Sequence, residues 1–366
     1  MNKIKFFLQF VILVFLSCDS NSDDTNQNNS NIFNGSIVLS SQEEVDDFGS
    51  NGYEIVTGNI QIVDTSNNIV DLSSLNSIKR IERKLTLFNC QNLIEINGFN
   101  ALEYVEDFVV SACVNLTNIS GLDNLETISR SIFIGDNASL ENITLEVTGN
   151  SMSFECNNNS SLEVVELPNL NELDFFRLNN LSINISFNFQ SLNTVNEYIR
   201  IIDNLFTTLD GFDNLSYCRE ILFLDNPGLV NITAFENISE ASAITLINNP
   251  LLSDISGFSN LQVISSLHMD LNETIENIDG LSGLTQITNR VRIRENVQLN
   301  NLNGLINVNS IGDTSTGEIN ITGNLMLSDL CGISNAVVNG NFNENYLIEG
   351  NLLNPTQEDF INGICN

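Results

Sequence analysis

Apolar and polar residues alternate in short segments that recur at a nearly fixed interval along most of the chain. In the clearest stretch, residues 219–299, four segments fit one frame: apolar, any residue, apolar, two of any kind, then asparagine. Asn226, Asn249, Asn272 and Asn296 hold the asparagine place, with spacings of 23, 23 and 24 residues. A fixed period in this range is typical of a solenoid, in which each repeat forms one coil.

The period-two alternation predicts that each segment is a short strand with one face turned inward. The inward pairs in this stretch are Ile221/Phe223, Ile244/Leu246, Leu267/Met269 and Val291/Ile293. A single coil cannot bury such a face, so neighbouring coils are needed to exclude water from it. The asparagine side chains are expected to lie in line and to bond to the backbone of adjacent coils, because a buried amide needs a partner.

The same frame can be followed over residues 59–330, with its poorest fit over residues 142–190. Outside the first stretch, the asparagine place falls on Thr65, Cys90, Cys113, Asn137, Asn157, Leu181, Asn204 and Asn324, with Asn351 as a further candidate. A second motif between the strands begins with glycine, at Gly98, Gly121, Gly211, Gly257, Gly280 and Gly304. Glycine at this place suggests a backbone turn with positive φ.

The two ends of the array differ from its middle. Residues 36–58 contain Ser41 with Glu44 three places later, which predicts a helix opened by a capping box. Residues 331–366 form a last coil and a cap in which Pro355 opens a short helix. Without such caps, the first and last coils would expose an apolar edge.

Together, the motifs apolar-x-apolar-x-x-Asn-x-x-Leu and Gly-Leu-x-x-Leu-x-x-Ile resemble those of the bacterial receptor L-domain-like, leucine-rich-repeat solenoids over about residues 40–366. The resemblance implies a recognition role for an extended face. Leucine-rich repeats proper carry a longer helix on the outer side, whereas the short interval here favours a second strand or a 3₁₀ turn. The sequence therefore predicts a mainly β, right-handed parallel β solenoid of about 12 coils with short helical caps at each end.

The first residues have the composition of an export signal. Two lysines precede an apolar run, residues 6–16, that is too short to span a bilayer, so residues 1–17 are predicted to be a signal peptide. The run ends in Phe-Leu-Ser-Cys18, which resembles the bacterial lipobox and implies cleavage before Cys18 and lipid attachment to its thiol. An ordinary cleaved signal followed by an incidental cysteine is the alternative.

Residues 18–35 are rich in Asn, Ser and Asp and have too little apolar surface to fold, which predicts a flexible tether. Its Asp23-Asp24 pair resembles the acidic export signal of lipoproteins from Bacteroidota-type bacteria. The resemblance implies a protein lipid-anchored in the outer membrane and facing the cell exterior, with the lipid as its sole contact with the membrane.

The chain carries 13 Lys and Arg against 46 Asp and Glu, a net charge of −33. Loss of the two lysines of the signal peptide would make it 11 − 46 = −35. Such a charge argues against binding nucleic acid, whose phosphates it would repel, and against basic-patch binding to anionic lipid. An acidic surface of this kind keeps an exported protein soluble.

Seven cysteines are present, and an exported chain permits disulfides. We expect one between Cys331 and Cys365, where it would secure the C-terminal cap. Cys90 and Cys113 hold the same place on adjacent coils and are expected to be buried thiols, with a bridge between them as the alternative. The sequence does not assign partners to Cys156 and Cys218.

Catalytic motifs are missing from the sequence. The one histidine, His268, falls on the outward side of a strand, and no nucleophile elbow, phosphate loop or metal-spaced Cys/His set is present. We therefore predict a non-catalytic protein without a cofactor or a metal. Calcium bound by the Asp- and Asn-rich turns, as in an adhesin, is a distant alternative, because the Gly-Gly-x-Gly-x-Asp repeat is absent.

The frame also identifies a candidate ligand face. Outward positions on three successive coils form a mainly apolar patch with cationic residues beside it: Arg200/Ile202, Leu222/Leu224 and Thr245/Ile247, with Arg177 on one flank and His268, Arg292 and Arg294 on the other. The hypothesis is a face for a protein or glycan ligand. The alternatives are strand-forming residues stacked only for sheet stability and a structural envelope component without a discrete ligand.

Overall fold

The computed structural model of the chain describes residues 31–149, 152–312, 317–340, 342 and 345–366. The predicted signal peptide, the Cys18 lipidation site and residues 18–30 of the predicted tether lie outside the described residues. Residues 31–366 form one compact unit. The N-terminal strand of this unit, β1 (Ile32–Phe33), pairs with β3 (Ile55–Val56), so the chain is already ordered within the range expected for the tether.

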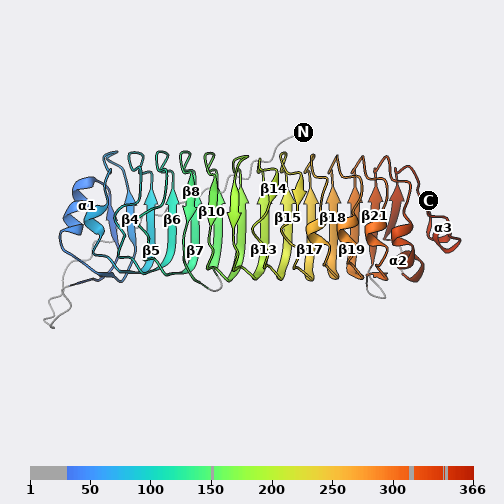
Figure 1. Ribbon diagram of the computed structural model, residues 1–366, viewed down its shortest axis with the longest axis horizontal. Helices are drawn as coiled ribbons and strands as arrows, with labels where there is room; N and C mark the ends of the chain where they lie inside the picture. The colour runs from blue at the N-terminus through green and yellow to red at the C-terminus, as the bar shows by residue number, and fades with distance from the viewer. Residues whose placement is uncertain (1–30, 150–151, 313–316, 341, 343–344) are drawn as a thin grey trace. The chain divides into compact units, whose positions relative to one another are not determined.

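Residues 31–366 are a mainly β, parallel β solenoid of about 13 turns with small helices, and Figure 1 shows its strands side by side. A 17-stranded sheet forms one side of the stack. Beside β1 and β3 its strands are β2 (Ile37–Leu39), β4 (Ile60–Val63), β5 (Arg80–Phe88), β6 (Tyr104–Ser111), β7 (Thr127–Gly135), β9 (Met152–Asn157), β11 (Glu172–Asn179), β13 (Thr194–Ile202), β15 (Tyr217–Leu224), β17 (Glu240–Ile247), β18 (Val263–Asp270), β19 (Gln286–Arg294), β20 (Ser310–Ile311), β21 (Glu318–Thr322) and β22 (Tyr346–Glu349).

Shorter elements form the rest of each coil. A three-stranded sheet contains β8 (Asn142–Thr144), β10 (Val164–Glu166) and β12 (Ser186–Asn188), and a two-stranded sheet contains β14 (Thr208–Leu209) and β16 (Asn231–Ile232). The 3₁₀ turns are η1 (Ser73–Leu75), η2 (Ser256–Phe258), η3 (Asp279–Leu281), η4 (Asn303–Leu305) and η5 (Cys331–Ile333). The expected short second strand and the 3₁₀ turn therefore both occur, on different coils.

The first coil begins earlier than the sequence frame indicated. Residues 36–58 were expected to form only a cap, but β2 pairs with β4 in register, Ile37 opposite Ile60 and Leu39 opposite Ile62. The segment around β2 is therefore already part of the stack, and the count of about 13 turns agrees with the predicted number of about 12.

The core is a continuous column of the inward residues. Ile221 and Phe223 of β15 lie opposite Ile244 and Leu246 of β17, and the four side chains are fully or almost fully buried. The same registration continues from coil to coil, because each strand pairs in parallel with the next. Neighbouring coils thus cover the apolar face of each coil. A single coil is too thin to exclude water from that face by itself.

A ladder of buried asparagines runs along the corner where the large sheet ends. Oδ1 of Asn249 accepts from the backbone N–H and from Nδ2 of Asn226, at 3.2 and 2.9 Å. Nδ2 of Asn249 donates to the backbone oxygen of Phe223 and to Oδ1 of Asn272, both at 3.2 Å. A backbone N–H to Oδ1 bond links each successive pair among Asn204, Asn226, Asn249, Asn272, Asn296, Asn324 and Asn351.

The ladder departs from the sequence frame at two places. Asn159, and not Asn157, is the buried member after Asn137, whose N–H it accepts at 3.1 Å. The register between β9 and β7 explains this shift. It places Cys156 opposite Ile134 on the inward face, so the turn, and with it the buried asparagine, comes two residues later in the sequence. On the coil that contains β4, Thr65 is exposed, and the buried carboxylate of Asp64 accepts from two backbone N–H groups instead.

The residue before each ladder position has a positive φ. Asp225, Asn248, Leu271 and Glu295 have φ between 54° and 59°, and the adjoining ladder asparagines are buried. A left-handed residue reverses the chain sharply, and Asn and Asp tolerate this conformation better than most residues. Each turn therefore pairs a residue in the left-handed conformation with a buried asparagine. The side chain of this asparagine forms hydrogen bonds with backbone groups in the core.

The glycines between the strands were expected to have a positive φ, and only some of them do. Gly121 and Gly211 do have φ of 84° and 83°. Gly257, Gly280 and Gly304 lie in or beside the 3₁₀ turns with φ outside the left-handed region, so the expectation is wrong for them. Their lack of a side chain serves close stacking instead, since a Cβ on Gly304 would lie 1.8 Å from the backbone oxygen of the preceding coil.

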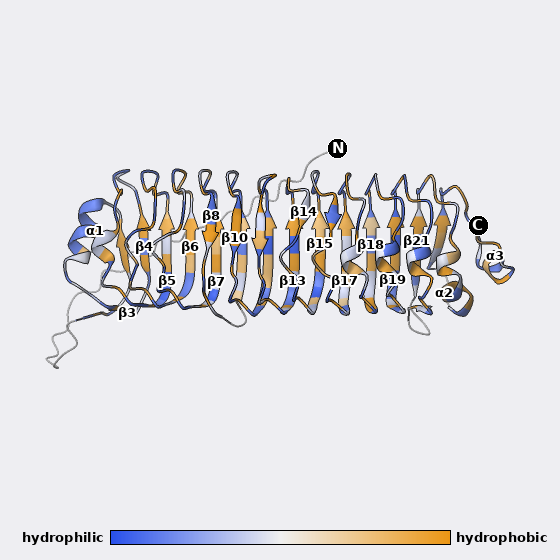
Figure 2. Ribbon diagram, viewed as in Figure 1, coloured by the Kyte–Doolittle hydropathy of each residue, from blue (hydrophilic) through white to orange (hydrophobic). Residues whose placement is uncertain are grey.

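Both ends of the unit carry helices. α1 (Gln42–Gly49) begins at Ser41, whose hydroxyl accepts from the N–H of Glu44, and Figure 2 shows its hydrophilic surface at one end of the stack. At the other end lie α2 (Ser334–Asn339) and α3 (Gln357–Ile361), and Thr356 opens α3 with a capping box.

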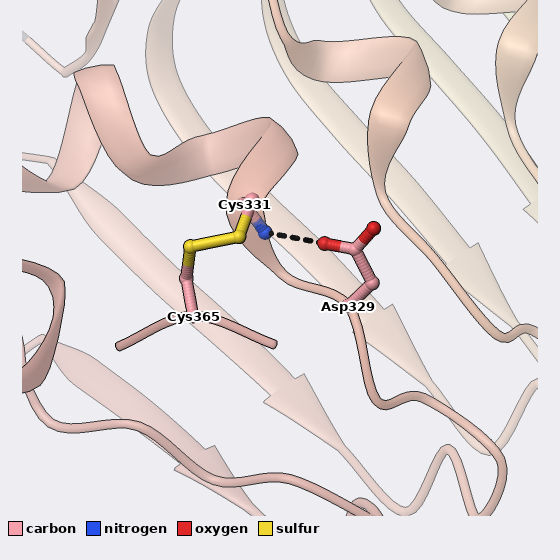
Figure 3. Close-up of a disulfide and its surroundings, with 3 residues drawn as sticks. All are labelled: Asp329, Cys331 and Cys365. Carbon is pink, nitrogen blue, oxygen red and sulfur yellow. Dashed lines mark hydrogen bonds between the residues drawn. A yellow bond between two sulfur atoms is a disulfide. The ribbon is translucent and has the colours of Figure 1, made fainter. Parts of the chain in front are cut away.

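The disulfide predicted between Cys331 and Cys365 is confirmed and joins the chain end to η5 (Figure 3). Oδ1 of Asp329 accepts from the backbone N–H of Cys331 at 3.0 Å and orients the same turn. The C-terminal residues are therefore held to the last coils by a covalent bond.

Candidate functional site

The predicted ligand-face residues lie in two adjacent rows on the outer face of the large sheet. The strand register aligns them across β13, β15, β17, β18 and β19. One row is Arg200, Leu222, Thr245, His268 and Arg292, and the other is Ile202, Leu224, Ile247, Asp270 and Arg294. The structure thus brings all nine predicted residues together and adds Asp270 among them.

The centre of this face is aliphatic. Ile202, Leu222, Leu224 and Ile247 are each half-buried, because neighbouring strands about 4.8 Å away cover their flanks while their tips stay accessible. Thr245 lies in the same rows and adds a hydroxyl. We call Ile202, Leu222, Leu224, Thr245 and Ile247 the aliphatic patch; such a group could bury an apolar part of a ligand.

On the C-terminal side of the patch, Asp270 organises the cationic residues. Its Oδ2 accepts from Nη2 of Arg292 at 2.9 Å and from Nη2 of Arg294 at 2.6 Å. Nε2 of His268 lies 2.8 Å from the same oxygen. Asp270 is buried, whereas the two arginine side chains are 32% and 34% exposed. The acid therefore holds the arginines in place and leaves part of each in contact with solvent.

The sequence reasoning missed Asp270, although a signal was present. It follows the inward Met269 directly, so the frame places it on the outward row that continues from Ile247 to Arg294. An acid at an outward position beside a strand that carries three arginines predicts an ion pair across the sheet.

On the N-terminal side, aromatic residues accompany the arginines. The rings of Phe175 and Tyr198 are 4.7 Å apart, and the guanidinium of Arg200 lies 3.9 Å from the ring centre of Tyr198. Arg177 pairs with Glu155 at 3.2 Å. Glu155 offsets the charge of Arg177, whereas Arg200 keeps its charge and stacks on Tyr198, so this flank is less cationic than the predicted rim. Phe175 and Tyr198 were not identified from the sequence, although both precede a basic residue by two places.

A cavity of about 530 Å³ lies on another side of the solenoid, beside β10, β12 and β14. Its lining includes the acids Glu163 and Asp210 with Ile183, Thr207 and Thr208. Burial raises the pKa of Asp210. The cavity occurs where the three-stranded sheet gives way to the two-stranded one. No feature of the repeat frame indicated it.

The cysteines outside the disulfide are buried thiols. Cys90, Cys113, Cys156 and Cys218 are free and have no exposed surface. The contact with the Cys113 thiol, together with burial, raises the pKa of Cys90. Burial raises the pKa of Cys156 and Cys218 to about 12. These side chains fill core positions, and the bridge considered between Cys90 and Cys113 is not formed.

Two further properties bear on function. Over the described ranges of the chain, no three His, Cys, Asp or Glu side chains gather closely enough to hold a metal ion. Within the same ranges, none of the helices has the length and apolar character needed to cross a membrane.

Comparisons of this chain with protein-family models, with curated proteins and with solved structures find no match.

Proposed function

We propose that this chain is a non-catalytic recognition or adhesion protein that presents the outer face of its large sheet to a protein or glycan ligand. The observation that supports the proposal most is the aliphatic patch beside Arg292 and Arg294, on an exposed sheet face of a chain with net charge −33. A contiguous apolar surface next to fixed charges is what binding interfaces require. The motif resemblance to receptor L-domain-like solenoids points the same way, as an analogy of fold only.

The proposal includes attachment to the cell surface. Residues 1–17 act as a lipoprotein signal peptide, Cys18 carries the lipid, and the polar tether places the solenoid on the exterior of the outer membrane. The support is the sequence Phe-Leu-Ser-Cys18 after an apolar run and the Asp23-Asp24 pair. In the producing bacterium, Cys18→Ser should release the protein from the membrane fraction, and protease added to intact cells should degrade the wild-type chain. Protein that stays membrane-bound after the substitution would refute the anchor.

Binding is tested with cells that display the full chain. The wild type is applied to a glycan array and used in a surface pull-down, beside the variant Leu224→Asp/Ile247→Asp. The two carboxylates would place charge in the centre of the aliphatic patch, so ligand binding should be lost while the fold remains. Ile94→Asp/Val70→Asp, at exposed apolar positions away from the patch, is the matched control and should bind normally.

The outcomes separate the candidate functions. Loss of binding in the patch variant alone supports recognition through this face. Equal binding by the patch variant and the wild type refutes it. A wild-type chain that binds neither proteins nor glycans, but whose deletion weakens the envelope, would favour a structural component. Binding that needs added calcium would favour a calcium-stabilised adhesin.

A further inference from the structure

Lysine and arginine are rare in the chain after Arg219, and those present lie together on one strand. After Arg219, the sequence contains only three Lys or Arg residues, Arg290, Arg292 and Arg294, at alternate positions of β19. Alternate residues of a strand share one face, and the buried Val291 between them marks that face as the outer one. The strand is therefore a local reversal of charge on a strongly acidic protein.

Asp270 neutralises only part of this charge. One carboxylate faces two guanidinium groups, so an excess of one positive charge remains even with His268 neutral. Oδ1 of Asp270 and Nε of Arg292 are buried and have no hydrogen-bond partner among the described residues. Buried polar atoms without partners cost free energy, and a bound group or ordered water commonly satisfies them. The arrangement is thus a held pair of cations with one unused N–H donor, on Arg292, beside one unused acceptor, on Asp270.

The next coil adds two neutral polar side chains beside the arginines. Asn320 of β21 lies opposite Arg292, and Thr322 lies opposite Arg294. Both side chains occupy outer-row positions about 4.8 Å from their arginine neighbours. We call Arg292, Arg294, Asn320 and Thr322 the arginine site. Two guanidinium groups beside an amide and a hydroxyl are suited to a carboxylate, which Arg binds through paired N–H donors.

The arginine site continues directly into the aliphatic patch. Ile247 and Arg294 lie in one row with Asp270 between them, which separates them by about 10 Å. The patch is built from Leu and Ile side chains, whereas a sugar ring would need a flat aromatic surface on which to stack. The nearest outward aromatic ring in register, Tyr198, already carries Arg200 at 3.9 Å. These observations favour a peptide over a glycan.

We infer that the arginine site binds an Asp or Glu side chain of a protein partner whose adjacent apolar residue packs on Leu224 and Ile247. This inference rests on the proposed function and names the chemistry of the partner. The general acidity of the chain does not prevent it, because charges more than about 10 Å away are largely screened at physiological salt. The local excess of positive charge then determines which segments can dock.

The probe is a random peptide library displayed on phage and selected on the full chain, followed by fluorescence anisotropy with synthetic copies of the selected peptides. The expected peptides carry Asp or Glu next to Leu, Ile or Phe. Changing the acid to its amide should weaken binding by about 10-fold, the usual scale for a partly exposed charge pair. Selected peptides that are basic or uncharged would overturn the inference.

The protein side is tested by the variant Asp270→Asn/Arg292→Gln/Arg294→Gln. It removes the buried acid together with its cations, so no unpaired buried charge is left to unfold the coil. Its circular dichroism should match that of the wild type, and its affinity for the acidic peptides should fall by about 10-fold or more. Arg219→Gln, a surface arginine paired with Glu197 away from the arginine site, is the control and should bind as the wild type does.

The two proposals fail differently. If the patch variant Leu224→Asp/Ile247→Asp loses binding while the triple variant keeps it, the face is functional and the arginine site is not part of it. If both variants bind the acidic peptides as the wild type does, the proposed face itself is wrong. If an acidic glycan binds through Arg292 and Arg294 and no peptide does, the inferred partner class is wrong.

Discussion

Nδ2 of Asn226 donates to Oδ1 of Asn249 on the next coil, with 2.9 Å between the two atoms. The same oxygen also accepts the backbone N–H of Asn226. From Asn226 to Asn324, each ladder amide therefore accepts from a backbone group and from a side chain of the coil before it, in a region without exposed surface. Because the bonds are buried and shared, the ladder couples the coils more strongly than apolar contact alone.

Replacing one member should destabilise the stack locally. Asn249→Ala would leave the N–H of Asn226 buried without its acceptor, at a cost of about 3 kcal/mol. Denaturant unfolding measures the free-energy change, and hydrogen exchange should show faster exchange in the coils beside residue 249. Asn260→Ala is the matched control: its exposed amide donates to the backbone oxygen of Glu236, and its loss should cost at most about 1 kcal/mol. Equal costs would contradict the role assigned to burial.

Removing the disulfide should loosen only the C-terminal coils. The bridge closes a segment with a sequence separation of 34, and Cys331→Ser/Cys365→Ser should lower the stability of that end by about 3 kcal/mol. Hydrogen exchange should accelerate in β22 and α3 and stay unchanged in β13 to β17, because contacts in a solenoid are with neighbours only. Uniform acceleration along the chain would argue against such independence.

Acid should weaken the pairing of Asp107 with Arg130. Burial alone would raise the pKa of Asp107, but the bonds from Arg130 and Ser131 outweigh it and lower the pKa. A lowered pKa means that the contribution is present above the unfolded value of about 3.9 and is lost as the pH falls through the folded value. Because Arg130 is 61% exposed, we expect a contribution of about 1 kcal/mol.

The measurement is the free energy of unfolding of the wild type and of Asp107→Asn at pH 7 and near pH 2.5. The two proteins should differ at neutral pH and converge on acidification. A difference that is independent of pH would show that the carboxylate charge is not what stabilises this contact.

Gly304→Ala should force two coils apart. The new Cβ would lie 1.8 Å from the backbone oxygen of Ile278, which belongs to the adjoining coil and cannot move alone. The cost should be about 3 kcal/mol, as for other overpacked sites. Ser282→Ala, at an exposed position next to η3, provides the control and should change thermal stability little.

The thiols of Cys90, Cys113, Cys156 and Cys218 should resist alkylation in the native protein. All four are buried, and burial also raises the pKa of Cys156 and Cys218 to about 12, so these two have almost no thiolate at pH 8. Mass spectrometry after iodoacetamide treatment should find these four unmodified until denaturant is added. Rapid labelling of any of them in the native state would contradict the packing described here.

Much of the fold could be predicted because the sequence of each repeat by itself indicates which residues face the core. The repeated frame assigns inward and outward residues within each strand, and a mismatch in any coil would place polar groups in the core. Asn226, Asn249, Asn272 and Asn296 are recognisable from spacing alone. The C-terminal disulfide follows from two cysteines near the expected C-terminal cap.

The incorrect predictions concern residues whose position depends on how one coil pairs with the next. Apolar residues at 152, 154 and 156 followed by three asparagines permit two frames, and contact with β7 selects the one with Asn159 inside. The glycine corners look alike in sequence, yet close stacking alone explains Gly304, whereas Gly121 combines close stacking with a positive φ. The cavity beside Asp210 likewise depends on which side chains become neighbours where one sheet gives way to the next, which the repeat frame does not show.

The parallel register of the large sheet also determines how the molecule can change length. Every coil offers its neighbours nearly the same contacts, so duplicating or deleting one repeat would leave the two joined surfaces compatible. The separation between the caps would then change in increments of about 4.8 Å. Unequal recombination could therefore lengthen or shorten the solenoid by whole coils without changes to the residues of its core.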